Sequence, residues 1–95
     1  MKKIFYTEHL YLRLKIRNFS EDYPKLIYQY PEQKFFDNLE KINISIKRLK
    51  YNEKLRNIMI AYHENEDVVS IITIHPISDE KIFNRLLSGR WSKNG

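Results

Sequence analysis

The chain has no cysteine and only two glycines, Gly89 and Gly95, among its 95 residues. Without cysteine it has no disulfide, no thiolate metal cluster, no thiol redox chemistry and no cysteine nucleophile. With so few glycines it also lacks the glycine-rich loop that holds nucleotide phosphates. No apolar run reaches the roughly 18 residues of a membrane span, and the N-terminal stretch has no signal-peptide core. We therefore expect a cytoplasmic protein that does not interact with a membrane.

The size and charge of the chain limit what it can do. Residues 1–95 are enough for a single small domain with one core, since 42% of them are hydrophobic. Residues 1–50 hold eleven Lys and Arg against six Asp and Glu, whereas residues 51–95 hold six against six, so the net charge of +5 lies in the first half. Such an excess is typical of a surface that binds phosphates or an acidic partner. It also fits a lysine-rich, alanine-poor composition, and the charge alone leaves both interpretations open.

The first third of the chain has helical periodicity. Residues 7–17 form a first predicted helix with Thr7 as its N-cap. Ser20 is the predicted cap of a second helix, which Pro31 ends. Two helices joined by so short a turn are expected to form an antiparallel helical hairpin.

The remaining sequence changes its period from 3.6 residues to 2. This change predicts an antiparallel β-sheet meander built from residues 34–75, although residues 32–41 fit a strand or a helical turn equally well. Residues 3–6 are a further short strand, and a last helix is expected at residues 78–87, with Gly89 after its end. The predicted fold is α+β: a helical hairpin packed on one face of an antiparallel sheet meander, with the helices all on that face and a short C-terminal helix.

Three basic side chains, His9, Arg13 and Arg17, stand four residues apart on the first predicted helix. At about 100° per residue they fall inside the helix's apolar arc. The arc is made of Leu10, Leu12, Leu14 and Ile16. Arginines that face a core are costly unless they are paired, hydrogen-bonded or open onto a cleft. Two interpretations stay open: the arginines pair with acids such as Asp37 or extend past the helix edge, or the three side chains line a partly shielded anion-binding cleft in which Arg13 is the most enclosed.

The first three quarters of the chain resemble a known family of small toxins. The resemblance is carried by EHLYLRLKIRNFSEDYPKLIYQYP, with its His-x3-Arg-x3-Arg spacing and S-E-D cap, by two hydrophobic strands, and by the strand end IITIHP. These features are similar to BrnT-related small domains of the RelE/ParE toxin–antitoxin superfamily, over residues 7–76 and onward to Trp91. The resemblance implies a RelE/ParE-like fold and a toxin-like, metal-independent endoribonuclease without a cofactor. It also implies a small acidic antitoxin-like protein as inhibitor.

The family motif assigns roles to particular residues. The positions that match it are His9, Arg13, Arg17, Thr73, His75 and Pro76. Cleavage of RNA without a metal needs a base for the 2′-hydroxyl, cations for the phosphorane and an acid for the leaving oxygen. His9 and His75 are the candidate acid and base, and Arg13 the catalytic cation. In one respect the chain departs from RelE-type enzymes, because no tyrosine follows Tyr62.

Further residues are expected to bind the RNA. Guanidinium and ammonium groups hold phosphates, and an indole ring stacks on a base. The RNA-binding candidates are Arg17, Arg48, Lys50, Arg90 and Trp91. Trp91 is equally well interpreted as a plug that folds back on the sheet. A histidine at a strand end before proline, such as His75, is also typical of a hydrogen-bonded cap. Strict alternation along the last strand places this histidine on one face with Val69, Ile71 and Thr73.

Other function classes find weaker support. The acids and histidine of residues 63–67 have no metal-ligand spacing and read as a polar turn. Two alternatives to the endoribonuclease remain: a non-catalytic RNA- or protein-binding module of the same fold, and a homodimeric accessory protein of viral or plasmid origin.

Overall fold

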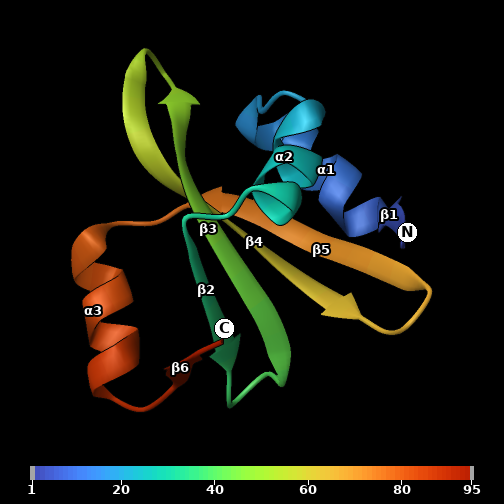
Figure 1. The fold of residues 1–95 in the computed structure, drawn as a ribbon. Coiled ribbons are helices and arrows are strands. Elements are labelled where there is room, and N and C mark those ends of the chain that lie inside the picture. Colours follow the sequence, from blue (N-terminus) through green and yellow to red (C-terminus); the bar gives the residue numbers. More distant parts are fainter. Residues whose placement is uncertain (1, 95) are drawn as a thin grey trace.

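The computed structural model describes residues 2–94, which form three helices and one six-stranded sheet (Figure 1). The strand order is β1-β5-β4-β3-β2-β6. The strands are β1 (Lys3–Tyr6), β2 (Gln33–Asp37), β3 (Ile42–Tyr51), β4 (Lys54–Glu64), β5 (Val68–Pro76) and β6 (Trp91–Lys93), and the helices are α1 (Glu8–Arg17), α2 (Asp22–Gln29) and α3 (Asp79–Leu87). The predicted α+β class is confirmed. Within the part of the chain that the structure describes, no helix is long and apolar enough to cross a membrane.

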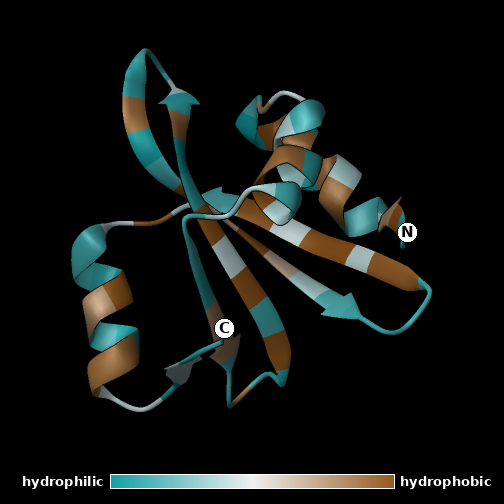
Figure 2. Cartoon of the chain, viewed as in Figure 1, coloured by the Kyte–Doolittle hydropathy of each residue, from teal (hydrophilic) through white to brown (hydrophobic). Residues whose placement is uncertain are grey.

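The predicted antiparallel meander is present. β2, β3, β4 and β5 pair antiparallel in succession, and the ambiguous stretch 32–41 supplies β2 and the turn after it. Figure 2 shows hydrophobic and polar residues alternating along β3, as expected for a strand with two different faces. At one edge β1 joins β5 in parallel, so the sheet as a whole is not purely antiparallel. At the other edge the unpredicted β6 pairs antiparallel with β2.

The helices cover both faces of the sheet, so the expectation that all of them lie on one face is wrong. α1 packs on β5, and α2 packs on β3 and β4, on the same side (Figure 1). α3 packs on the opposite side. The reason lies in β4, where Ile58, Ile60 and Tyr62 point toward α1 and α2 while Met59 and Ala61 point toward α3. Since both faces of β4 are apolar, each needs a helix to cover it.

Local signals set the ends of α1 and α3 as the sequence predicts, whereas the predicted cap Ser20 is wrong for α2, whose N-cap is Glu21 without a side-chain cap hydrogen bond. The Thr7 hydroxyl accepts the backbone N–H of Leu10 at 3.1 Å at the start of α1. The Ser78 hydroxyl accepts the N–H of Lys81 at 3.1 Å at the start of α3, and Gly89 follows the end of α3 with a φ of 79°. A positive φ is strained for residues with a side chain, which explains the glycine at this position.

Candidate functional site

A bulge in β5 decides where His75 points. Ala61 pairs with Thr73, but Tyr62 pairs with Ile71, so Ile72 has no partner in the ladder between β4 and β5. One extra residue reverses the alternation beyond it. The prediction that His75 and Thr73 share a face with Val69 and Ile71 is therefore wrong. His75 and Thr73 lie on the α3 face, opposite α1 and α2.

On the α3 face His75 lines a shallow groove of about 260 Å³, which we call the His75 groove. Its apolar floor comes from β3, β4 and β5, and includes Ile44, Met59 and Ala61. One wall is α3, and the end is closed by Trp91 and its neighbours. The groove thus combines an apolar floor with a half-buried imidazole, a combination that suits a ligand with both flat apolar and charged parts.

The walls of the groove are mainly cationic. Lys81 and Arg85 stand one turn apart on α3 and form no ion pair with any of residues 2–94. The acids that line the groove are Asp37 and Glu40, and Arg90 engages both, with Nε 3.2 Å from Asp37 Oδ2 and Nη2 3.9 Å from Glu40 Oε1. The charges of Lys81 and Arg85 are therefore left for an anion.

The charges of two cations on α1, Arg13 and Arg17, also act on His75, although neither side chain lines the groove. Arg13 and Arg17 are partly shielded, as predicted, and both lie close enough to influence the charge state of the imidazole. Nε of Arg17 is buried and has no hydrogen-bond acceptor within residues 2–94. A buried N–H without an acceptor is costly, so this atom favours an anionic ligand beside it.

The imidazole of His75 is poised as a base. Its Nδ1 lies 3.1 Å from the carbonyl oxygen of Pro76, which can only accept, so Nδ1 donates and Nε2 keeps the lone pair. Burial lowers the pKa of His75 below its ordinary value of 6.5, and the charges of Arg17, Lys81 and Arg13 lower it further, against the opposing effect of the bond to Pro76. The ring is therefore neutral at pH 7.

Titration of His75 provides a direct measurement of this arrangement. In NMR spectra we expect its imidazole to titrate below pH 6.5, and to titrate at a higher pH in an Arg13→Gln/Arg17→Gln variant, because two neighbouring cations are removed. Lys15→Gln, on the exposed side of the same helix, is the control and should leave the titration unchanged. The unfolded chain takes up this proton at a higher pH than the folded one, so stability should fall as pH drops below about 6.5. A titration at or above 6.5, or the same in wild type and double variant, would contradict the arrangement.

The other predicted site residues are placed differently. His9 is exposed and not sheet-facing; its Nε2 accepts a hydrogen bond from Arg13 Nε at 3.2 Å. The buried stripe of α1 is narrower than the apolar arc, since Leu12 and Ile16 are 52% and 64% exposed, and His9 lies on their side of the helix. Trp91 is only 4% exposed, so it is a core plug and not a stacking surface.

The remaining three cations contribute unequally to the groove. Arg90 lines it but is bound to Asp37. Arg48 is exposed and reaches Asn57 Oδ1 at 3.4 Å, in a separate hollow near the start of α3, and Lys50 is exposed on β3. Lys81 and Arg85 are not among the predicted site residues, although their spacing of four residues on the last predicted helix was an available signal.

Comparisons of the sequence and the structure with known proteins identify no relative. The chain matches no family model, no curated protein and no solved structure. Within residues 2–94 no three His, Cys, Asp or Glu side chains lie together in a way that could hold a metal ion. The assignment of function therefore depends on the groove itself.

Proposed function

We propose that this chain binds the phosphodiester backbone of single-stranded RNA in the His75 groove. The proposal is carried by one observation: Lys81 and Arg85 line the groove beside His75 without an ion pair among the described residues, and the charges of Arg13 and Arg17 act on the same imidazole. Guanidinium groups bind phosphate through two parallel hydrogen bonds, which suits Arg85 on the wall of the groove. The apolar floor suits the ribose and base of a flexible single strand better than a rigid duplex.

Metal-independent cleavage of the bound RNA is the second candidate, and the neutral imidazole of His75 favours it. In this reaction His75 Nε2 takes the proton of a 2′-hydroxyl, whose oxygen forms a bond to the adjacent phosphorus. The bond from phosphorus to the 5′-oxygen breaks, giving a 2′,3′-cyclic phosphate and a 5′-hydroxyl. Arg13 stabilises the phosphorane charge, and a protonated His9 is the proposed acid for the leaving oxygen; in that form its Nε2 carries a proton and no longer accepts from Arg13.

The resemblance to BrnT-related toxins gives this function a biological setting. A RelE/ParE-like helical hairpin on the sheet, a toxin role and a small acidic inhibitor belong to the same proposal. An acidic protein bound over Lys81 and Arg85 would compete with RNA for the same cations. Inhibition would then need no contact with His75.

RNA affinity is the test of the binding proposal. In fluorescence anisotropy with a labelled single-stranded RNA, Lys81→Gln/Arg85→Gln is expected to weaken binding about a hundredfold, since charge-assisted hydrogen bonds contribute about 1.5–3 kcal/mol each. Affinity should also fall with salt, with a log–log slope of about 0.7 per phosphate contacted. Lys15→Gln/Lys54→Gln removes the same charge from exposed positions away from the groove and should weaken binding less than threefold. Equal losses in the two double variants, or binding that ignores salt, would refute the groove as the RNA site.

The same RNA, analysed for its integrity, separates the two candidate functions. If the chain is an endoribonuclease, the products end in 2′,3′-cyclic phosphate, and His75→Gln abolishes cleavage while retaining most of the RNA affinity. Intact RNA after prolonged incubation with the wild type leaves the non-catalytic binding module as the function.

A further inference from the structure

The outer edge of β1 is open. No segment within residues 2–94 pairs with it, since β1 ends the strand order. The N–H groups of Lys3 and Thr7 donate to carbonyl oxygens of residues 67–71, at 2.9 and 3.2 Å. Alternate residues of a strand direct their backbone groups to opposite sides, so Ile4 and Tyr6 direct theirs outward. These outward groups are ready to pair with a further strand.

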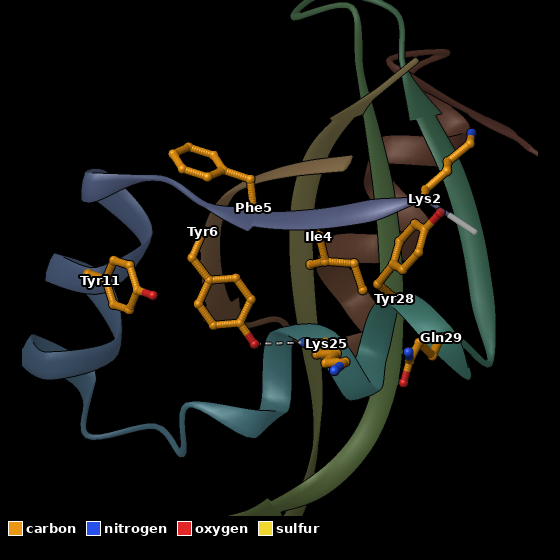
Figure 3. Close-up of a pocket in the computed structure, with 8 residues that line it drawn as sticks. All are labelled: Lys2, Ile4, Phe5, Tyr6, Tyr11, Lys25, Tyr28 and Gln29. Carbon is orange, nitrogen blue, oxygen red and sulfur yellow. Dashed lines mark hydrogen bonds between the residues drawn. The ribbon is translucent and has the colours of Figure 1, made fainter. Parts of the chain in front are cut away.

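Next to this edge there is space for the side chains of an added strand. A pocket of about 760 Å³ lies between β1 and α2 on the helix side of the sheet (Figure 3). Figure 3 shows Tyr6 and Tyr11 at one end of this pocket and Tyr28 at the other, while Phe5 points away from α2. The side chains of Phe5 and Tyr11 are 55% and 51% exposed. Helices α1 and α2 therefore leave room for the inward side chains of an added strand, and aromatic side chains of this kind are enriched at protein interfaces.

The sequence of the edge is complementary to itself. Residues 2–6 read Lys-Lys-Ile-Phe-Tyr. When two copies run antiparallel about a two-fold axis at Ile4, each Lys2 lies opposite Tyr6 and each Lys3 opposite Phe5. Lysines on an edge strand normally prevent pairing, but here the ammonium group of Lys2 is already paired with Glu64 at 2.8 Å, and that of Lys3 meets the ring of Phe5, which attracts it. We propose that a second copy of this chain adds its β1 in this register and so joins two sheets into one.

Backbone geometry selects this register over its neighbours. Residues 2, 4 and 6 direct their backbone groups outward, and each must lie opposite an outward residue of the second copy. A two-fold axis midway between two residues would place outward residues opposite inward ones, so such registers are excluded. An axis at Lys3 would place two lysines face to face. An axis at Phe5 would place Lys2 opposite Glu8, which belongs to α1 and has no strand geometry to pair. The Ile4 axis alone pairs all three outward residues.

Cysteine crosslinking tests the register, because the chain has no cysteine of its own. Positions 3 and 5 of opposite copies form a pair without backbone hydrogen bonds, with Cα atoms about 4.5 Å apart, within disulfide range. An equimolar mixture of Lys3→Cys and Phe5→Cys, oxidised with glutathione disulfide, is therefore expected to give a disulfide heterodimer, and each variant alone only traces of dimer. The pair Phe83→Cys and Leu87→Cys, also exposed on α3, is the control and should give no disulfide-linked dimer under the same conditions.

The association itself is measured by sedimentation. The wild type is expected to dimerise, and Phe5→Lys to raise the dimer dissociation constant at least tenfold, because it places a lysine opposite Lys3. Phe83→Lys makes the same change on exposed α3 and should leave the constant unchanged. A wild type that stays monomeric at 100 µM would overturn the proposal and leave the edge to a different polypeptide. Crosslinking by Phe5→Cys alone would overturn the Ile4 register.

Discussion

Replacing Asp37 with alanine is expected to lower the free energy of unfolding by about 3 kcal/mol, because it leaves four donors without their acceptor, including the buried indole N–H of Trp91 and the guanidinium of Arg90. The carboxylate is 4% exposed and joins β2, the turn after it and β6. Oδ1 accepts the N–H groups of Leu39 and Glu40 at 3.0 and 2.9 Å. Oδ2 accepts from Arg90 Nε at 3.2 Å and Trp91 Nε1 at 3.1 Å. Urea unfolding followed by tryptophan fluorescence measures the loss.

The pH dependence of stability identifies the carboxylate as the cause. Burial alone would raise the pKa of Asp37, but hydrogen bonds from Glu40, Trp91 and Leu39 and the charge of Arg90 outweigh it and lower the pKa. The carboxylate therefore contributes stability that is fully present above about pH 4 and is lost as pH falls through the folded-state pKa. Asp37→Ala should lose less stability than the wild type in that acid range. Glu40→Ala is the matched control: this exposed carboxylate pairs with Arg90 at 3.9 Å, and its loss should cost less than about 1 kcal/mol. Equal costs for the two variants would show that Asp37 is not the anchor of β6.

The second large effect concerns α1, which carries Arg13 and Arg17. Leu10 is fully buried against the sheet, and its replacement by alanine is expected to cost about 3 kcal/mol, from lost apolar burial and the cavity left behind. Leu12, two residues away on the same helix, is 52% exposed. Leu12→Ala should therefore change the free energy of unfolding by less than about 0.5 kcal/mol.

These two variants test which side of α1 is buried, the side in the structure or the wider apolar arc predicted at 100° per residue. The wheel includes both leucines in one apolar arc, whereas the structure buries only the side centred on Leu10 and Leu14. Chemical denaturation of both variants settles the matter, since a similar cost at positions 10 and 12 would mean that α1 is rotated about its axis. Such a rotation would also move Arg13 and Arg17 away from His75.

The proposals for the His75 groove and for the β1 edge are independent of each other. Loss of RNA binding in the Lys81→Gln/Arg85→Gln variant with an intact dimer would leave the edge proposal standing. A wild type that binds RNA as a monomer would refute the edge proposal and leave the RNA-binding proposal standing. Each proposal is thus tested without assuming the other.

Sequence alone determined the three helices and most of the strands, although not β6. The period of the apolar residues predicted α1, α2 and the meander, and the caps Thr7, Ser78 and Gly89 predicted where two helices begin and one ends. These signals are local, because a cap or an alternating strand depends on residues at most four positions apart. The partial shielding of Arg13 and Arg17 was likewise present in their positions on the helix.

Only the tertiary structure decided which face each element presents. The bulge at Ile72 places His75 on the α3 face, and one extra residue in a strand gives no sequence signal. The parallel pairing of β1 and the attachment of β6 through Asp37 join segments more than 50 residues apart. The apolar residues on both faces of β4 draw α3 to the side opposite α1, and this brings Lys81 and Arg85 to the groove. Period and capping act within one element, whereas register, face and burial are settled only when distant elements pack together, and the site of this protein belongs to the second kind.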